Sequence, residues 1–347
     1  MKKIVTFGEI LLRLTPPAYL KFAQTNQFCA TFGGSETNVA VSLAHQGMHS
    51  EFVTKLPDND IARAAIAELR SHNVEVDHIA TGGSRLGLYY YENTSSFRTS
   101  KVVYDRANSS FSTSVINDYD WTHIFHDADW FHWSGIGPAL SQDAANVILD
   151  AINIARSKGL TISADLNYRK NLWQYGKTPL QVMPQLATQC DVLFGTESEY
   201  EKTFGVKALP FTLTSDTQTY DLEPHRQFCE QVMTLAPKCK YMFVAQRNVI
   251  DAKRHVFHAL LYTADHHFYQ SKIYFMDNIV DCVGCGDAFA AGMIYALAHF
   301  PNDPQQTLNY ATAAAILKNS ISGDFNLSSA SEILTLALGD SSGRISR

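Results

Sequence analysis

Short apolar segments of strand length alternate along most of the chain with longer segments in which apolar residues recur every three or four positions. The longer period is typical of helices with one buried face, and the short runs bounded by turn residues are typical of strands. The pattern predicts an α/β protein with a mostly parallel central sheet and helices on both faces. Strands are predicted at Ile4–Phe7, Phe52–Leu56, Trp130–Ser134, Leu160–Ala164, Asp191–Phe194 and Tyr241–Ala245. Helices are predicted at Glu36–Gln46, Ile61–His72, Gln142–Lys158, Glu197–Phe204, Asp287–His299, Pro304–Asn319 and Ser329–Leu338.

Two regions lack the helical period. Residues 11–31 and 86–110 are rich in aromatic and other β-prone residues that alternate with polar ones. We expect them to form a small sheet that projects from a single domain of residues 1–340 and closes over a site as a lid. A hairpin is expected between Val256–Thr263 and His267–Ile273. Because a small, partly apolar sheet is hard to stabilise alone, we also expect a homodimer formed by two lids.

Composition narrows the class of protein. Of the 347 residues, 46% are hydrophobic and 18% are charged, as in ordinary globular proteins. The 28 basic and 34 acidic residues give a net charge of −6 without a long basic run, so nucleic acid and anionic membranes are not expected partners. The chain has no signal-like segment and no 18-residue apolar span, which predicts a cytoplasmic location. Its six scattered cysteines are expected to be reduced.

The most informative motif is Gly284–Asp287, where two glycines and a carboxylate precede an apolar helix. Glycines let the backbone approach a ligand, and the free N–H groups of a first helical turn bind anions, so the motif predicts a phosphate site. The helix dipole at this place favours the ionised form of Asp287, which can then take a proton from a hydroxyl that attacks a phosphoryl group. An ordinary glycine turn capped by aspartate would give the same pattern.

Other phosphate-binding and metal-binding patterns fit less well. Phe289 stands where a dinucleotide-binding motif needs its third glycine, and the sequence contains no P-loop motif. The spacing of Cys282 and Cys285 resembles a redox or zinc pair, but no second pair accompanies it. Phosphoryl transfer therefore remains the favoured chemistry.

A second glycine pair, Gly33 and Gly34, precedes a helix whose first turn carries Asn38. The glycines let a polyol approach the backbone, and an Asn amide both donates to and accepts from hydroxyl groups. Alone, this pair is equally consistent with a structural turn. Together with Gly284–Phe289, it resembles the two signatures of the ribokinase-like (PfkB) carbohydrate kinases.

The resemblance covers nearly the whole chain and is strongest to the members of that family that phosphorylate 2-keto-3-deoxygluconate. The segments that carry it are Gly33–Ala40, Val103–Ser109, Asp165–Trp173, Gly284–Phe289 and Ser322–Asn326. It implies a three-layer α/β/α sandwich with a β-lid, and transfer of the γ-phosphoryl group of ATP to a sugar-acid hydroxyl, giving a 6-phosphate. Mg²⁺ is the implied cofactor, with a monovalent cation such as K⁺ as a further candidate.

The resemblance also implies roles for individual residues. Asp287 is the expected base, and Gly284, Cys285 and Gly286 form the expected anion hole. Glu199 is expected to support the Mg²⁺ ion. Residues expected around the sugar are Gly33, Gly34, Asn38, Tyr89, Tyr104, Arg106 and Arg169. Residues expected around the nucleotide are Asn167, Arg169, Thr196, Glu199, Gln246, Gly284 and Gly286.

The chain departs from the family pattern at three places. The family's Asn-x-x-Glu segment is Thr196–Glu199 here, which keeps the glutamate and loses the amide. No glycine occurs from residue 206 to residue 283, and the place of the usual glycine-rich loop near the nucleotide is taken by Gln246–Ile250. Cys285 stands where alanine is common. These departures leave sugar binding better supported than the details of nucleotide binding.

Arg106 and Arg169 favour an acidic substrate, because a guanidinium fork matches a carboxylate and a neutral hexose would leave it without a charged partner. Both arginines could instead pair with the neighbouring Asp105 and Asp165, and Arg169 could serve a phosphate of ATP. The alternatives to a 2-keto-3-deoxygluconate kinase are a kinase of another sugar, such as fructose or ribose, and a sugar-sensing protein without catalysis. Asp287 speaks against the sensor, because a carboxylate in an anion hole would repel phosphate.

Overall fold

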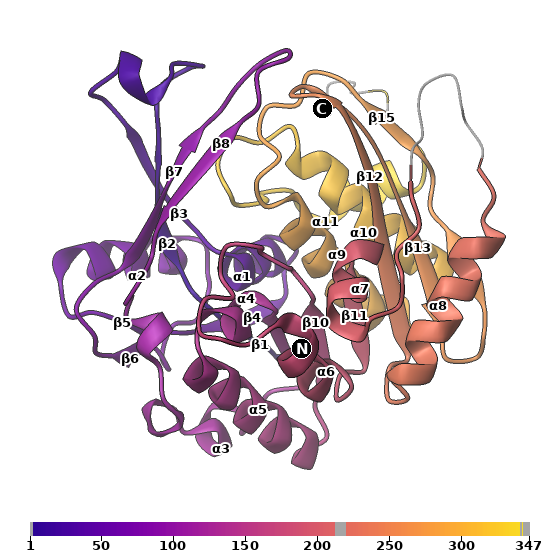
Figure 1. The fold of residues 1–347 in the computed structure, drawn as a ribbon, viewed down its shortest axis with the longest axis horizontal. Helices are drawn as coiled ribbons and strands as arrows, with labels where there is room; N and C mark the ends of the chain where they lie inside the picture. The colour runs from indigo at the N-terminus through magenta and orange to yellow at the C-terminus, as the bar shows by residue number, and fades with distance from the viewer. Residues whose placement is uncertain (1–2, 212–219, 341, 343–347) are drawn as a thin grey trace.

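The large sheet forms the centre of the molecule. In this computed structural model, which describes residues 3–211, 220–340 and 342, the sheet contains nine strands (Figure 1). They are β1 (Lys3–Phe7), β4 (His49–Val53), β9 (Trp130–Ser134), β10 (Thr161–Asp165), β11 (Val192–Gly195), β12 (Tyr241–Asp251), β13 (Arg254–Thr263), β14 (Phe268–Gln270) and β15 (Tyr274–Met276). The order is β14-β13-β12-β11-β10-β9-β1-β4, with β15 beside β13. Strands β1, β4 and β9–β12 are parallel, and β13–β15 continue the sheet antiparallel.

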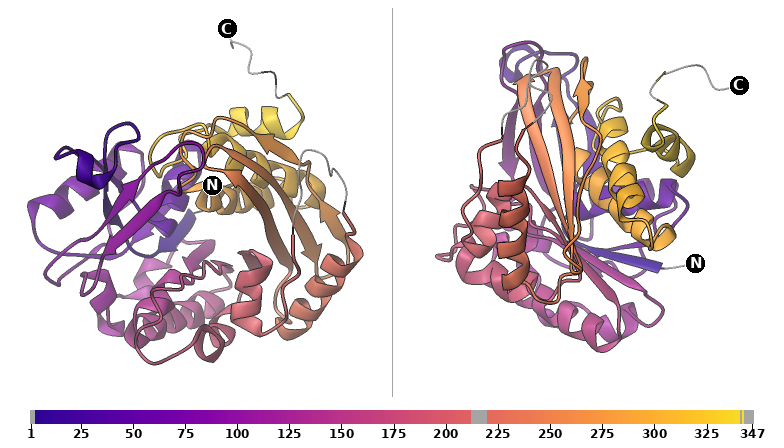
Figure 2. Two further views of the ribbon diagram at one scale, coloured as in Figure 1. Left: turned by 45° about the horizontal axis from the view of Figure 1, so that its top comes forward. Right: turned by 90° about the vertical axis from the view of Figure 1, so that its right-hand side faces the viewer.

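Helices cover both faces of this sheet and complete three layers (Figures 1 and 2). One face packs against α1 (Ser35–His45), α9 (Cys285–His299) and α10 (Pro304–Lys318). The other face packs against α5 (Gln142–Ser157), α6 (Pro179–Ala187), α7 (Glu197–Phe204) and α8 (Glu223–Leu235). The remaining α-helices in the described residues are α2 (Asp60–Ser71), α3 (Trp121–Ile124), α4 (Ile136–Leu140) and α11 (Ala330–Ala337). Because both faces are covered, the central strands are buried at nearly every position rather than at alternate ones.

The lid is a second sheet that rises beside the N-terminal half of the large sheet (Figure 1). Its strands are β2 (Leu11–Thr15), β3 (Cys29–Gly33), β7 (Gly87–Glu92) and β8 (Lys101–Asp105), in the order β3-β2-β7-β8. They come from the two segments that lacked a helical period. A further pair of short strands, β5 (Lys55–Leu56) and β6 (Ala80–Thr81), lies below the lid.

Several element predictions need correction. The segment Phe52–Leu56 is divided between β4 and β5 rather than forming one strand. The expected loop at Gln246–Ile250 is strand, because β12 continues to Asp251 and pairs with β13 through Val249, with a register shift between Val249 and Asp251. The hairpin expected in residues 256–273, by contrast, is confirmed: β13 and β14 pair antiparallel. Helices α6 and α8 were not predicted, and α6 contains an internal proline, Pro184, which weakens a helical pattern.

None of the helices in the described part of the chain is both long enough and apolar enough to span a membrane.

Candidate active site

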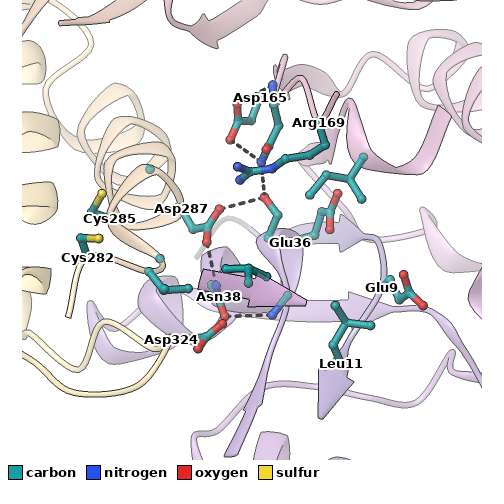
Figure 3. A pocket seen from close by; sticks show the side chains of 18 of the residues that line it. Glu9, Leu11, Glu36, Asn38, Asp165, Arg169, Cys282, Cys285, Asp287 and Asp324 are labelled. Carbon is teal, nitrogen blue, oxygen red and sulfur yellow. Dashed lines mark hydrogen bonds between the residues drawn. The ribbon is translucent and has the colours of Figure 1, made fainter. Parts of the chain in front are cut away.

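A cavity of about 360 Å³ opens where the carboxyl ends of the parallel strands face the underside of the lid (Figure 3). Loops after β1, β10 and β11 supply its floor, and the first turns of α1 and α9 enter it from the sides. In open α/β sheets, ligands bind at this edge. The volume is that of a small-molecule site. Of the predicted site residues, the cavity brings together Gly34, Asn38, Tyr89, Tyr104, Arg106, Asn167, Arg169, Thr196, Glu199, Gly284, Cys285, Gly286 and Asp287.

The two glycines before Asp287 have different physical roles. Gly284 has a left-handed φ of +85°, and a Cβ there would lie 2.1 Å from the carbonyl oxygen of Asp324, so only glycine fits. A Cβ on Gly286 would meet a ring carbon of Phe194 at 3.9 Å, which is ordinary contact. Protein packing therefore does not require glycine at 286. The space that it leaves, at the first turn of α9, is open to a ligand in the cavity.

Asp287 is held by the first turn of α1. Its Oδ1 accepts a hydrogen bond from the hydroxyl of Ser35 at 2.8 Å, and its Oδ2 accepts one from the amide of Asn38 at 2.7 Å (Figure 3). The other amide atom of Asn38, Oδ1, accepts from the backbone N–H of Gly34 at 3.2 Å. Both carboxylate oxygens of Asp287 thus have fixed neutral donors.

Burial is the main influence on the pKa of Asp287. Burial raises the pKa of this carboxyl to about 6, and the hydrogen bonds from Asn38 and Ser35 oppose that rise. Burial, which the sequence did not indicate, thus opposes the ionised form that the helix dipole favours. A pKa near 6 leaves the group ionised at neutral pH and makes it a stronger base than an exposed aspartate, as suits proton abstraction.

Arg106 has a partner that the sequence did not indicate. Its Nε donates to Oε2 of Glu9 at 2.9 Å, its Nη2 contacts the same oxygen, and both side chains are buried. Asp105, the partner considered from the sequence, pairs instead with Arg85 at 2.8 Å. Glu9 Oε1 is buried beside the cavity without a hydrogen-bond partner in the described part of the chain. The Glu9–Arg106 pair therefore presents both a guanidinium and a free carboxylate oxygen to a ligand.

The hydroxyl group of Tyr89 is bound within the protein, to Asp324. This hydroxyl lies 2.6 Å and 2.7 Å from the two carboxylate oxygens of Asp324. Asp324 also accepts from Arg13 Nη1 at 2.7 Å, and Arg13 Nη2 donates to Asp281 at 2.6 Å. Asp281 in turn accepts from the backbone N–H of Val283 at 3.0 Å. A buried network thus joins lid strands β2 and β7 to the start of the loop before α9.

The nucleotide-side residues gather at the other end of the cavity. Thr196 caps α7, and Glu199 Oε2 accepts from the Thr196 N–H at 2.7 Å. Asp165 is buried at the end of β10; burial first, and then the charges of Glu199 and Asp287, raise its pKa well above the usual range. Arg169 and Arg247 line the cavity, and neither forms an ion pair with a carboxylate in residues 3–211, 220–340 and 342. The alternative left open by the sequence, a pairing of Arg169 with Asp165, is therefore not an ion pair in this part of the chain.

Two predicted site residues lie outside the cavity. Gln246 is buried on the opposite face of β12, where its amide donates to Glu197 at 3.2 Å. Its neighbour Arg247 faces the cavity instead, since successive strand residues point to opposite faces. At Gly33 a Cβ would lie 2.2 Å from a carboxylate oxygen of Asp324, so this glycine serves close packing.

Sequence reasoning missed several residues that line the cavity, namely Glu9, Ser35, Glu36, Asp165, Arg247 and Asp324. Glu36 is fully buried, and burial raises its pKa to about 7, with a hydrogen bond from Ser134 opposing the shift. A signal was present for Ser35 and Glu36, because they stand in the first turn after Gly34. For Glu9 and Arg247 the only signal was a position at or beyond the carboxyl end of a strand.

The fold and this site define a class of protein. A family model described as "pfkB family carbohydrate kinase" matches residues 1–220 and 258–326. The chain belongs to this family and is a carbohydrate kinase.

Individual relatives act on sugar acids. A 2-dehydro-3-deoxygalactonokinase of Haloferax volcanii is 28% identical and matches over 98% of each chain. The crystal structure of a 2-dehydro-3-deoxygluconokinase of Thermotoga maritima is 39% identical, with a TM-score of 0.89 over 97% of this chain and 98% of its own. A 2-dehydro-3-deoxygluconokinase of Bacillus subtilis is 26% identical over 84% of this chain and 81% of its own.

Proposed function

We propose that this kinase transfers the γ-phosphoryl group of ATP to the terminal hydroxyl of a 2-keto-3-deoxy sugar acid, with 2-keto-3-deoxygluconate as first choice and its 6-phosphate as product. One observation supports the proposal most directly. Asp287, with a pKa near 6, stands at the N-terminal end of α9 in the same cavity as a lid-side arginine, Arg106, and a second arginine, Arg169, which forms no ion pair with a carboxylate of the described residues. Relatives over nearly the full length carry sugar-acid kinase names, which supports the substrate class.

The chemistry assigned to the chain's own residues is simple. Asp287 takes the proton from the attacking hydroxyl, so the O–H bond breaks as the new O–P bond forms and the O–P bond to ADP breaks. The backbone N–H groups of residues 284–286 stabilise the negative charge of the transferred phosphoryl group. Closure of the lid excludes water, which would otherwise accept the phosphoryl group.

The sugar-acid half of the cavity is assigned to Gly34, Asn38, Tyr104 and Arg106. Arg106 is held by Glu9 through Nε and Nη2, which fixes the plane of its guanidinium and leaves Nη1 for the substrate carboxylate. The free Oε1 of Glu9 can accept from a substrate hydroxyl. Tyr89 shapes this half through its bond to Asp324 rather than by a hydroxyl available to the sugar.

The nucleotide half is assigned to Asn167, Arg169, Thr196 and the anion hole, and Glu199 is assigned to Mg²⁺. None of the described residues donates a hydrogen bond to Glu199 Oε1, while Oε2 is used by the cap. No cluster of three or more His, Cys, Asp or Glu side chains able to hold a metal occurs within the described ranges. This fits Mg²⁺, which binds through one or two carboxylates, water and phosphate oxygens. The ion would supply charge neutralisation between the phosphates.

A homodimer through the lid is part of the proposal. Large apolar side chains that do not line the cavity are exposed on the lid and its loops: Tyr19, Phe28, Phe97 and Val103. Exposed apolar surface gathered on one small sheet is typical of interaction surfaces. The cytoplasmic location and the use of K⁺ stay predictions from the sequence.

A substrate panel tests the proposed activity. ADP release would be measured with 2-keto-3-deoxygluconate, 2-keto-3-deoxygalactonate, 5-keto-2-deoxygluconate, fructose and ribose. The third compound is included because relatives carry the name 5-dehydro-2-deoxygluconokinase. We expect the highest kcat/KM for a 2-keto-3-deoxy acid. Preference for fructose or ribose would overturn the acid assignment and keep the kinase, and binding of the acid without ADP release would favour the sensing protein.

A further inference from the structure

A chain of hydrogen bonds leads from the floor of the cavity to the base. The amide nitrogen of Asn167 donates to Asp165 Oδ2 at 3.1 Å and to Ser35 Oγ at 3.0 Å. Ser35 Oγ then donates to Asp287 Oδ1 at 2.8 Å (Figure 3). Ser35, Asn167 and Asp165 are all buried, so water does not compete for these bonds.

The direction of each proton in this chain is determined. An amide nitrogen only donates, so the Ser35 oxygen must accept from Asn167. The Ser35 hydroxyl has a single proton. Because its oxygen accepts from Asn167, this proton is donated to Asp287 Oδ1. The backbone of Asn167 is tied to the same partner, because its N–H donates to Asp165 Oδ1 at 3.1 Å. Its φ of +37° lies in the left-handed region, which a non-glycine residue adopts only when surrounding contacts hold it.

We propose that Ser35 is a positioning residue for phosphoryl transfer: its hydroxyl, aligned by Asn167, orients Asp287 and stabilises the charged form that accepts the substrate proton. The inference rests on the proposed role of Asp287 as base. Asn38 makes the matching bond to the other carboxylate oxygen. The free lone pairs of Asp287 are thereby left to the cavity, where the hydroxyl of the substrate is expected.

Other charged groups also affect the pKa of Asp287, and the variants used in a test must leave these groups unchanged. They are Arg169 and Asp324, together with the buried carboxyls of Glu36 and Asp165. Replacing Ser35 by alanine removes the neutral donor to Asp287, together with the acceptor of one Asn167 N–H, and leaves all of these charges in place. Loss of one hydrogen bond to a charged group should raise the pKa of Asp287 by about one to two units.

The experiment is the pH profile of kcat/KM for the sugar acid with the full chain. In Ser35→Ala the acidic limb should move up by about one to two pH units, so that activity at pH 6 falls about 5- to 40-fold further than activity at pH 8.5. Ser35→Thr, which keeps the hydroxyl, should restore the wild-type limb. Asn167→Gly, which tolerates the left-handed φ, should shift the limb in the same direction. Ser42→Ala, a buried serine on the same helix that does not line the cavity, is the control and should show no shift.

The outcomes separate this inference from the proposed function. A uniform loss in Ser35→Ala at every pH, or a limb at the wild-type position, overturns the positioning role. Full activity in Asp287→Asn overturns the base itself. An inactive Asp287→Asn together with an unshifted Ser35→Ala rejects only the inference drawn here.

A separate observation concerns the missing glycine-rich loop. Because β12 continues as strand to Asp251, it carries Arg247 to the cavity, where Nη1 lies 4.0 Å from Cys285 Sγ in the anion hole. The guanidinium has no ion pair within the described ranges and is exposed. A cation without a carboxylate partner, next to a helix N-terminus that is itself suited to anions, matches a chain of phosphates.

We also infer that Arg247 binds the phosphates of the nucleotide and takes the place of the backbone donors of a glycine-rich loop. The probe is ADP, titrated calorimetrically into the full chain. Arg247→Ala should weaken ADP binding at least tenfold and reduce its salt dependence, because a charged hydrogen bond is lost. Sugar-acid affinity should change less than twofold. Arg254→Ala, at the same hairpin and paired with Asp251, is the matched control and should bind ADP as wild type does. ADP affinity within twofold of wild type in Arg247→Ala overturns the assignment.

Discussion

The buried pair of Arg106 and Glu9 offers the sharpest test of the site, because one substitution should affect stability and specificity separately. Both side chains are less than a tenth exposed, and the Arg106 Nε donates to Glu9 Oε2 at 2.9 Å. Arg106→Ala would leave the Glu9 carboxylate buried without its cation. Removing one partner of a buried ion pair costs about 3–5 kcal/mol in the free energy of unfolding. For a chain of 347 residues this corresponds to a fall in Tm of about 4–7 °C.

The stability assay is thermal and denaturant unfolding of three variants. Arg106→Ala should show the full loss, and Glu9→Gln/Arg106→Ala should recover at least half of it, because the unpaired charge is gone. Arg85→Ala is the control, since Arg85 and Asp105 form an exposed pair on the neighbouring part of the lid. Exposed pairs contribute about 0–1 kcal/mol. An Arg106→Ala protein within 1 kcal/mol of wild type would refute the reasoning about burial.

The catalytic assay is kcat/KM for a sugar acid and for a neutral sugar. If Arg106 holds the substrate carboxylate, Arg106→Ala should lower kcat/KM for the acid by roughly 10- to 150-fold, the equivalent of about 1.5–3 kcal/mol. Activity toward neutral sugars should hardly change. Equal impairment on both substrates would show that the variant damages the cavity in general, and the acid assignment would lose its main support.

Four further predictions follow from the site and the lid. Asp287→Asn should retain sugar and nucleotide binding but lose about 10²–10⁴-fold in kcat, and a variant with more than half of wild-type kcat would contradict the base. Since burial raises the pKa of Asp287 to about 6 and the base acts ionised, kcat/KM should fall about tenfold per unit below pH 6 and level off above pH 7; a profile flat to pH 5 would reject this. Glu199→Gln should raise the Mg²⁺ concentration for half-maximal rate with sugar affinity nearly unchanged, whereas an unaltered Mg²⁺ titration would make Glu199 a helix cap only. Sedimentation should give a dimer at micromolar concentration, and a 38.7 kDa monomer would exclude the lid interface.

Much of the architecture could be predicted because local pattern and topology agree. Strand Trp130–Ser134 and helix Glu197–Phe204 have the bounds that the periodicity gives. Loops after parallel strands share one edge, so motifs as distant as Gly34 and Gly284 were expected in one site. The structure places both at the cavity.

The failures have physical causes that a single sequence does not reveal. Arg106 and Glu9 are 97 residues apart, and their pairing depends on how lid and sheet pack. Gln246 was assigned to the nucleotide because its segment was taken as a loop, but in a strand a shift of one residue exchanges the two faces and selects Arg247. For Asp287 the sequence argument considered only the helix dipole, whereas the burial that raises its pKa could be known only from the tertiary structure.

The network around Arg13 limits how lids could be exchanged between related kinases. Arg13 on β2 holds two carboxylates of the C-terminal half, Asp281 and Asp324, and Asp281 holds the N–H of Val283 one residue before the anion hole. A grafted lid without a cation at position 13 would leave both carboxylates buried without an ion-pair partner. The segment just before the anion hole would then be held less firmly, because Asp281 binds the N–H of Val283. Chimeras designed to alter sugar specificity should therefore transfer Arg13, Asp281 and Asp324 as one unit.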